Sequence, residues 1–158
     1  MAMMSAITLA GILSATPAAA VPATPEGLWQ TGRDGGVVEI SRCHGGAFCG
    51  RIVGLPAGGP GAAMPVDSEG HPQCGLSIIT DATKTGTGIW TGEILDPRDG
   101  KSYHVQLSVD DKGRLQVRGY VGLPLFGRTV TWTPFAGQIG ADCRIVAPET
   151  REAGPIGD

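Results

Sequence analysis

Aromatic residues are scarce in this chain of 158 residues, at 5% of the sequence, and charged residues are few, at 17%. Its 26 glycines and 12 prolines fit many short strands and turns better than long helices. The formal net charge is -3 at pH 7, and the lack of a basic excess argues against nucleic acid as a partner. The length suits one hydrophobic core, so we expect one domain.

The sequence also lacks the short motifs that mark common active sites. It contains no nucleophile elbow, phosphate-binding glycine loop, zinc-protease helix or c-type haem motif. Catalysis therefore has no support from motifs, and we predict neither catalytic residues nor a cofactor. A hydrolase built on Glu93, Asp96 or His104 is a distant alternative.

The first 20 residues, MAMMSAITLAGILSATPAAA, are uncharged, mostly apolar and end in small residues. They predict a secretory signal peptide over residues 1–20, cleaved near Ala20 and followed by a short lead over residues 21–26. The apolar run is shorter than the roughly 20 residues of a spanning helix, which argues against the alternative of an uncleaved anchor and predicts no transmembrane segment in the mature chain. No cysteine stands at the cleavage point, so a lipoprotein anchor is not indicated. The predicted location is therefore the periplasm or the cell exterior.

Residues 88–135 alternate apolar and polar side chains between turn signals, the pattern of an antiparallel β-meander. The first turn signal is the dipeptide of Asp99 and Gly100, which suits a two-residue hairpin loop. That loop would place apolar residues opposite one another, namely Ile94 with Val105 and Trp90 with Val109.

A second turn signal, Asp111 to Gly113, suits a three-residue loop with Gly113 in a bulge. It would pair Val109 with Leu115, Leu107 with Val117, and Tyr103 with Val121. The opposite face is then polar, as in a sheet that is packed on one side and solvated on the other. On that face His104 would lie beside Tyr120, and Gln106 beside Arg118. We predict a polar binding patch at His104, Arg118 and Tyr120, with an ordinary solvated sheet face as the alternative.

Upstream of the meander, residues 27–29 begin the first strand. Residues 36–43 and 48–55 then predict a hairpin, residues 74–80 a strand and residues 81–85 a turn.

About eight antiparallel segments result, and closing them into an up-and-down barrel removes the exposed edges of an open sheet. We therefore predict an all-β, up-and-down barrel over residues 27–135, with a β-sandwich as the alternative. Residues 56–73 have no periodicity and predict a long loop, which we interpret as a mobile insertion rather than a functional lid. Residues 136–158 have no amphipathic pattern and predict a weakly ordered tail.

Cys43 and Cys49 stand at the two mouths of the predicted hairpin turn, where a cross-strand disulfide can close. Four cysteines allow three connectivities. If Cys43 pairs with Cys49, then Cys74 and Cys143 form a second bridge or stay as two free thiols. A metal site that adds His44 or His71 is disfavoured, because an oxidising compartment favours disulfides over thiolate ligands. We predict no metal.

The largest apolar side chains are Trp29, Trp90 and Trp132. In a barrel of about eight strands such rings either fill the interior or line a cavity for one small ligand. Both solutions stay open on the residues alone, because the glycines nearby allow either a cavity or strand coiling.

Several short motifs follow one another along the chain: Gly27-Leu28-Trp29, Cys49-Gly50, Cys74-Gly75, Trp90-Thr91-Gly92, Asp96-Pro97-Arg98-Asp99-Gly100, Arg118-Gly119-Tyr120 and Gly127-Arg128-Thr129. The series resembles the bacterial secreted family catalogued as domain of unknown function 2147, which has no assigned activity. A looser similarity is to lipocalin and calycin barrels, on Gly27, Trp29 and Arg128. It implies a cup-shaped barrel that holds an apolar molecule and is closed by the Arg128 guanidinium on the Trp29 indole.

The leading hypothesis is a non-enzymatic β-barrel that binds a small apolar ligand. Its predicted ligand contacts are Trp29, Trp90, Tyr103 and Trp132, with Gly27 and Arg128 at the closure. The alternative is an envelope protein-protein interaction or structural module with a filled barrel, which would contact a protein partner through the polar patch.

Overall fold

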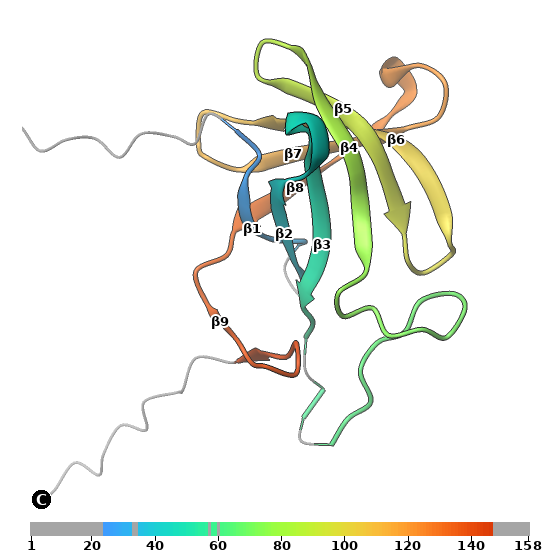
Figure 1. Cartoon of the computed structure of the whole chain (residues 1–158), viewed down its shortest axis with the longest axis vertical. Helices are drawn as coiled ribbons and strands as arrows, with labels where there is room; N and C mark the ends of the chain where they lie inside the picture. The colour runs from blue at the N-terminus through green and yellow to red at the C-terminus, as the bar shows by residue number, and fades with distance from the viewer. Residues whose placement is uncertain (1–23, 33–34, 57, 60, 147–158) are drawn as a thin grey trace, which may run out of the picture.

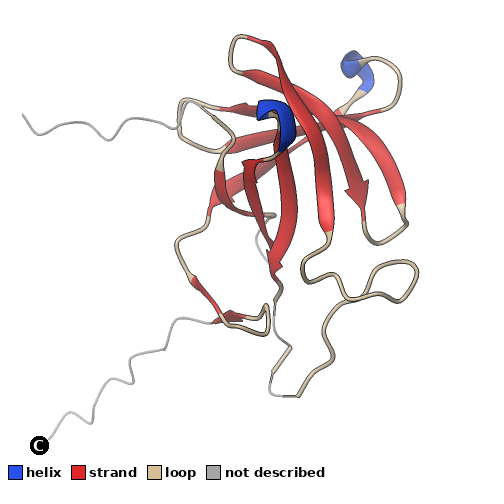
Figure 2. Ribbon diagram, viewed as in Figure 1, coloured by secondary structure: helices blue, strands red, loops and turns tan. Residues whose placement is uncertain are grey.

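The computed structural model describes residues 24–32, 35–56, 58–59 and 61–146, and the predicted signal peptide lies outside them. Eight antiparallel strands form a closed barrel in which each strand pairs with its neighbours in sequence and β8 pairs with β1 (Figures 1 and 2). The strands are β1 (Gly27–Gln30), β2 (Val37–Arg42), β3 (Phe48–Gly54), β4 (Ser77–Gly86), β5 (Ile89–Asp96), β6 (Lys101–Val109), β7 (Leu115–Tyr120) and β8 (Arg128–Pro134). The predicted up-and-down barrel is confirmed, and the sandwich alternative is wrong.

The connections between strands alternate between the two ends of the barrel, because consecutive strands run in opposite directions. The β1–β2, β3–β4 and β5–β6 connections meet at one end, which we call the open end. The β2–β3, β4–β5 and β6–β7 connections meet at the other, the closed end. The β7–β8 connection projects apart from those at the open end, at the top of Figure 1. One 3-10 turn, η1 (His44–Gly46), lies at the closed end, and another, η2 (Pro124–Phe126), lies in the β7–β8 connection.

The β5–β6 hairpin has a different register from the predicted one. Asp96 pairs with Lys101, so four residues form the connection and the predicted two-residue loop is wrong. The loop begins at Pro97, whose fixed φ suits an early turn position, and ends at Gly100, which has a φ of 71° and donates its amide to the Asp96 carbonyl at 2.9 Å. The register moves by two residues, so every side chain keeps its face. Ile94 therefore lies opposite Tyr103 and Trp90 opposite Leu107, in place of Val105 and Val109.

The β6–β7 hairpin follows the prediction. Gly113 has a φ of 72°, and the three-residue loop places Val109 opposite Leu115 and Leu107 opposite Val117. The ladder ends where His104 pairs with Tyr120, so the predicted pairing of Tyr103 with Val121 does not form.

Strand β4 is longer than predicted and runs through the expected turn at residues 81–85. It bends there instead, because Asp81 has a φ of 53° and the register with β5 shifts between Thr80 and Thr83. At this bulge β4 lies so close to β5 that a Cβ on Gly92 would be 2.4 Å from the Thr80 carbonyl oxygen. Glycine at position 92 is therefore required by the approach of the two backbones.

Two segments outside the strands of the barrel are tied to its open end. In the loop over residues 56–73, the Ser68 amide donates to the Pro97 carbonyl at 2.8 Å. Beyond β8, strands β9 (Gln138–Ile139) and β10 (Ile145–Val146) form a small hairpin, and the Leu55 amide donates to the Cys143 carbonyl at 2.8 Å (Figure 1). The prediction of a weakly ordered tail is thus wrong for residues 136–146, and residues 147–158 lie outside the described part.

All four cysteines are in disulfides. Cys43 pairs with Cys49 across the β2–β3 turn, with a Cα separation of 5.8 Å, as predicted. Cys74 pairs with Cys143 at 6.0 Å, so of the two alternatives left by the sequence, the second bridge forms. One bridge lies at each end of the barrel.

The interior of the closed end is filled by side chains. Phe48 and Trp90 pack edge to face there, with ring centroids 6.0 Å apart. Around them lie fully buried aliphatic residues on β2, β4, β6 and β7, namely Ile40, Ile79, Val105, Leu107 and Leu115. This half of the barrel is a hydrophobic core.

Candidate functional site

A cavity of about 560 Å³ occupies the open half of the barrel. Its floor is made of side chains that also belong to the core, Val38, Ile52 and Trp132, while Ile94 and Tyr103 form part of its wall. The mouth is formed by residues of three connections at the open end: Thr31, Gly32, Gly35 and Gly36 before β2, Leu55 and Gln73 after β3, and Pro97 and Arg98 after β5. Most of the wall is apolar, and polar groups gather at the mouth.

An ion pair between Asp96 and Arg98 lies at this mouth. Arg98 donates from Nε to Asp96 Oδ1 at 2.9 Å and from Nη2 to Oδ2 at 2.6 Å. These charge-assisted bonds from the Arg98 side chain hold the pKa of Asp96 below its ordinary value, against the opposing effect of partial burial. The carboxylate is therefore ionised at neutral pH, and the Arg98 side chain, 84% exposed, extends into solvent beside it.

The β1–β2 connection narrows the mouth by a close backbone approach. A Cβ on Gly36 would lie 2.8 Å from the carbonyl oxygen of Gly54, at the end of β3. The Thr31 amide donates to the Gly36 carbonyl at 2.9 Å and its hydroxyl donates to the same oxygen at 3.1 Å. The rim at this point is thus fixed by hydrogen bonds and by the absence of a side chain.

Two of the four predicted ligand contacts line the cavity, Tyr103 and Trp132. The other two lie in the core. Trp90 packs against Phe48, and Trp29 is buried with its indole Nε1 donating to the Pro25 carbonyl at 2.8 Å. The tryptophans thus divide between filling the barrel and lining the cavity.

The predicted closure by Arg128 on Trp29 is wrong. Trp29 pairs with Pro134 at the end of β8, whereas Arg128 begins that strand, six positions earlier. At about 3.3 Å per residue the two positions are about 20 Å apart. The seam is closed by backbone pairing and by the Phe135 amide, which donates to the Leu28 carbonyl at 2.9 Å. Gly27 lies beside the Trp29 indole, since a Cβ there would lie 3.6 Å from the indole Nε1.

The residues of the predicted polar patch lie together on β6 and β7. His104 is opposite Tyr120, with ring centroids 5.5 Å apart. Arg118 is opposite Gln106, but its guanidinium is engaged by the β7–β8 connection, donating to the carbonyls of Pro124 at 2.7 Å and Leu125 at 3.2 Å. Arg118 therefore fixes a loop, a role that the sequence did not indicate.

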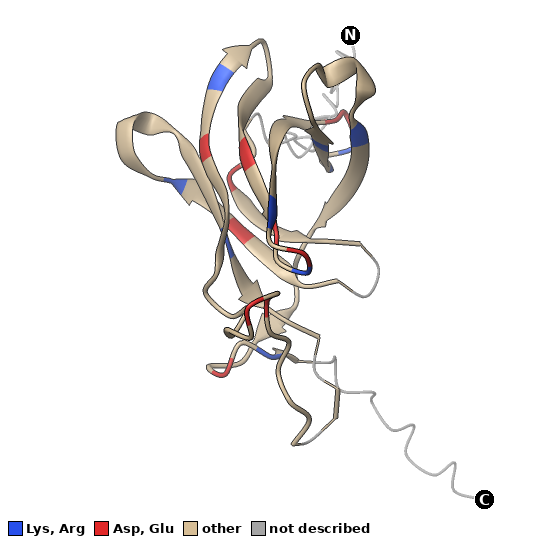
Figure 3. Cartoon of the chain, turned by 90° about the vertical axis from the view of Figure 1, so that its right-hand side faces the viewer, with Lys and Arg blue, Asp and Glu red and all other residues tan. Residues whose placement is uncertain are grey.

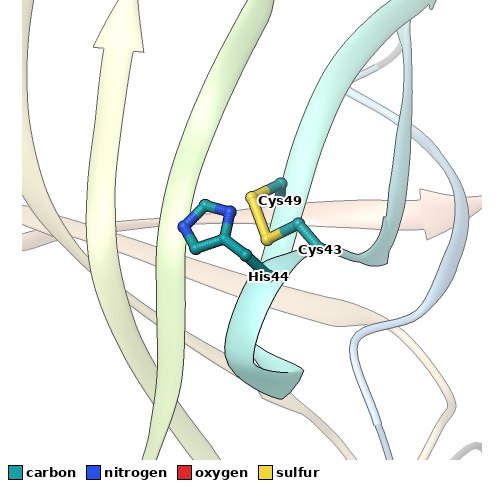
Figure 4. A group of neighbouring side chains, drawn as sticks. All are labelled: Cys43, His44 and Cys49. Carbon is teal, nitrogen blue, oxygen red and sulfur yellow. A yellow bond between two sulfur atoms is a disulfide. The ribbon is translucent and has the colours of Figure 1, made fainter.

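Cys43, His44 and Cys49 offer ligand atoms within 4.8 Å of one another (Figure 4). The two sulfurs are joined in a disulfide, so neither is a thiolate that could bind a metal. His44 contacts Asp81 instead, with Nε2 and Oδ1 2.5 Å apart. This cluster is a disulfide beside an exposed hydrogen bond between His44 and Asp81.

The mouth residues Gln73 and Arg98 were not predicted as site residues, and Asp96 was named only in the hydrolase alternative. The turn signal at residues 96–100 does mark a connection at a barrel end, but which connections surround a cavity depends on strand order and closure. That information is absent from any single segment of the sequence.

The fold and the cavity define a class: a closed eight-stranded barrel of lipocalin-like architecture with a cavity at one end. Residues 27–134 match the family described as "Uncharacterized protein conserved in bacteria (DUF2147)", and the chain belongs to this family. Both resemblances drawn from the sequence are thereby supported, the first by this match and the second by a solved structure.

That structure is protein HP1028 from Helicobacter pylori, described as belonging to the lipocalin family. It is similar to this chain with a TM-score of 0.57 and 21% identity, over 70% of this chain and 82% of that one. At this identity the likeness concerns the fold.

No curated protein matches the chain. Within its described residues, the chain has no helix of the length and apolarity needed to cross a membrane.

Proposed function

We propose that this protein binds one small amphiphilic molecule, mostly apolar and with a polar end, in the cavity of the open half. The observation that carries the proposal is the cavity itself, whose volume of about 560 Å³ falls within the roughly 300–1,000 Å³ of small-molecule sites. Apolar walls with a few convergent polar groups are also typical of such sites.

The two ends of the cavity would bind the two ends of the ligand. Ile52 and Trp132 at the floor offer apolar contact. At the mouth, Arg98 has guanidinium donors beyond the two that Asp96 accepts, and these are available to an acceptor on the ligand. The polar end of the ligand would therefore face the mouth, and its apolar part would face the floor.

Binding fits the lining better than hydrolysis does. The titratable side chains in the lining are Asp96, Arg98 and Tyr103. Asp96 already accepts two bonds from Arg98 and has a lowered pKa, which makes it a weak general base. Glu93 and His104, the other residues of the hydrolase alternative, pair with each other on β5 and β6 and are not in the lining.

A location outside the cytoplasm suits this function. The two disulfides are consistent with an oxidising compartment, and the predicted signal peptide would deliver the chain there. We infer that the protein acts in the periplasm or after secretion.

The test is titration with a fluorescent amphiphilic probe, comparing two tryptophan substitutions on β8. Val130 lines the cavity and is partly exposed, so Val130→Trp should fill space without opening the core. Thr133 is exposed, and because side chains alternate between the two faces along β8, it lies on the opposite face from Val130. Thr133→Trp is therefore the matched control. We expect saturable binding that weakens by about tenfold or more in Val130→Trp, or about 1.4 kcal/mol, and not in Thr133→Trp. Absence of saturable binding, or equal loss in both variants, would refute the proposal.

A further inference from the structure

The connection between β7 and β8 presents four large apolar side chains to solvent. Val121, Leu123, Leu125 and Phe126 are 63–78% exposed, and we call residues 121–127 the apolar loop. The other exposed large hydrophobic residues in the described part of the chain are spread over separate elements, at Leu28, Val66, Ile89, Val130 and Val146. A concentration of exposed apolar side chains in one short segment marks an interaction site.

The apolar loop is held in a fixed conformation. Arg118 donates to two of its carbonyls and, from Nη1, to Thr129 Oγ1 at 2.8 Å. The amides of Phe126 and Gly127 close the η2 turn by donating to the carbonyls of Leu123 and Pro124, at 3.1 and 3.0 Å. This hydrogen-bonded turn therefore holds the apolar side chains of the loop in solvent.

The loop lies apart from the cavity mouth. In Figure 1 the loop, drawn in orange, projects at the top of the barrel, whereas the segment over residues 56–73 lies at the bottom. None of the residues 121–127 lines the cavity. A surface that the loop enters would therefore contact the barrel away from the mouth.

The charges around the apolar loop are positive. No Asp or Glu occurs between Asp111 and Asp142, a stretch that includes β7, the loop and β8. Arg118 and Arg128 flank the loop directly, whereas elsewhere on the barrel acidic and basic residues are mixed (Figure 3). Tyr120 precedes the loop and lies opposite His104. His104 in turn lies opposite Glu93 on β5, which is an acidic residue in this row of the sheet.

An apolar tip with arginine and tyrosine at its base has the composition of segments that lie at a membrane interface. Arginine keeps its charge in the headgroup layer while its aliphatic part contacts apolar surface, and tyrosine favours the same layer. Anionic lipids attract the arginines, and the apolar side chains enter the boundary of the acyl chains.

We propose that the apolar loop docks the barrel, reversibly, on an anionic phospholipid surface. This docking is additional to ligand binding and does not require it.

The test is co-sedimentation with phosphatidylcholine vesicles prepared with and without phosphatidylglycerol, using protein purified after expression of the full chain in a bacterium. We expect tighter binding to the anionic vesicles, about tenfold weaker when Leu125→Ser and Phe126→Ser are combined. Ile89→Ser is the matched control, because Ile89 is an exposed apolar residue at the closed end. Arg128→Gln should reduce the preference for phosphatidylglycerol and leave binding to phosphatidylcholine unchanged.

Three results would overturn the proposal. The first is no vesicle binding by the unsubstituted protein, and the second is equal loss in the Ile89→Ser control. The third is a concentration-dependent dimer that the loop substitutions abolish, without vesicle binding, which would assign the loop to self-association. The Val130→Trp variant separates the two proposals, because it should lose the amphiphilic probe and retain vesicle binding.

Discussion

The closed and open halves of the barrel are built from the same eight strands but differ in what fills them. In the closed half, Phe48, Trp90 and fully buried aliphatic residues occupy the interior. In the open half the strands enclose a cavity of about 560 Å³, with Trp132 between the two. Stability is therefore concentrated in one half, and the other half contains the space in which we propose that a ligand binds.

The largest difference in stability between the halves should appear when one large side chain is truncated in each, Trp90 in the core and Ile94 in the cavity wall. Trp90→Ala removes a core ring and should cost about 3–5 kcal/mol of the free energy of unfolding. Ile94→Ala, in the cavity wall, should cost about 1 kcal/mol, because the space it vacates joins an existing cavity. Urea unfolding followed by circular dichroism measures both, and equal losses would contradict the division of the barrel.

The two disulfides should also differ, because they close chain segments of different length. Cys74 and Cys143 are 69 positions apart and Cys43 and Cys49 are 6 apart. On the chain-entropy model, removal by paired Cys→Ser substitutions should cost up to about 4 kcal/mol for the first and about 2 kcal/mol for the second. Thermal unfolding would test the order, and a larger loss from the short loop would show that local strand geometry, rather than chain entropy, sets their contributions.

A subtler comparison uses two glycines that both pair with Val105, Gly92 on one side and Gly119 on the other. A Cβ on Gly92 would meet the β4 backbone, so Gly92→Ala should destabilise the barrel by about 1–3 kcal/mol. A Cβ on Gly119 would meet nothing within 4 Å, so Gly119→Ala should be neutral or stabilise by about 0.5–1 kcal/mol through lower backbone entropy of the unfolded chain. Chemical denaturation of both variants measures these effects. If Gly92→Ala does not destabilise the barrel, the close approach of β4 and β5 is wrong.

The smallest expected effect is at the mouth and depends on pH. The folded-state pKa of Asp96 is below its ordinary value of 3.8, chiefly because of its bonds from Arg98, so the ionised carboxylate stabilises the fold above that pH. This stability is lost as the pH falls through the lowered pKa, and it is constant from pH 5 to pH 8. Asp96→Asn should therefore lose less melting temperature than the unsubstituted protein on going from pH 6 to about pH 3. An identical loss in both would mean that the ion pair is not formed in solution.

The alternation of apolar and polar residues was enough to predict the barrel and the facing of its strands. It predicted the β6–β7 register, because Gly113 marks a three-residue loop. It missed the β5–β6 register, because Asp99 and Gly100 form only part of a turn that already begins at Pro97. The bend of β4 at Asp81 was also missed, since a polar stretch indicates a turn and a bulge equally well.

The site was less predictable than the fold. Tyr103 and Trp132 could be named because large rings on the packed face must either fill the barrel or line a cavity. Which rings do which depends on how far the core extends along the barrel axis, a property of the closed sheet as a whole. Arg98 and the apolar loop lie in connections, whose places around the barrel follow only from strand order and closure.

Native mass spectrometry of the protein, purified without detergent and then extracted with solvent, tests the central claim that the open half contains a ligand. The account predicts one stoichiometric amphiphilic adduct on the unsubstituted protein, released by extraction and absent from Val130→Trp. A bare mass for the unsubstituted protein, with no adduct after incubation with membrane lipids, would contradict it and leave the cavity without a function.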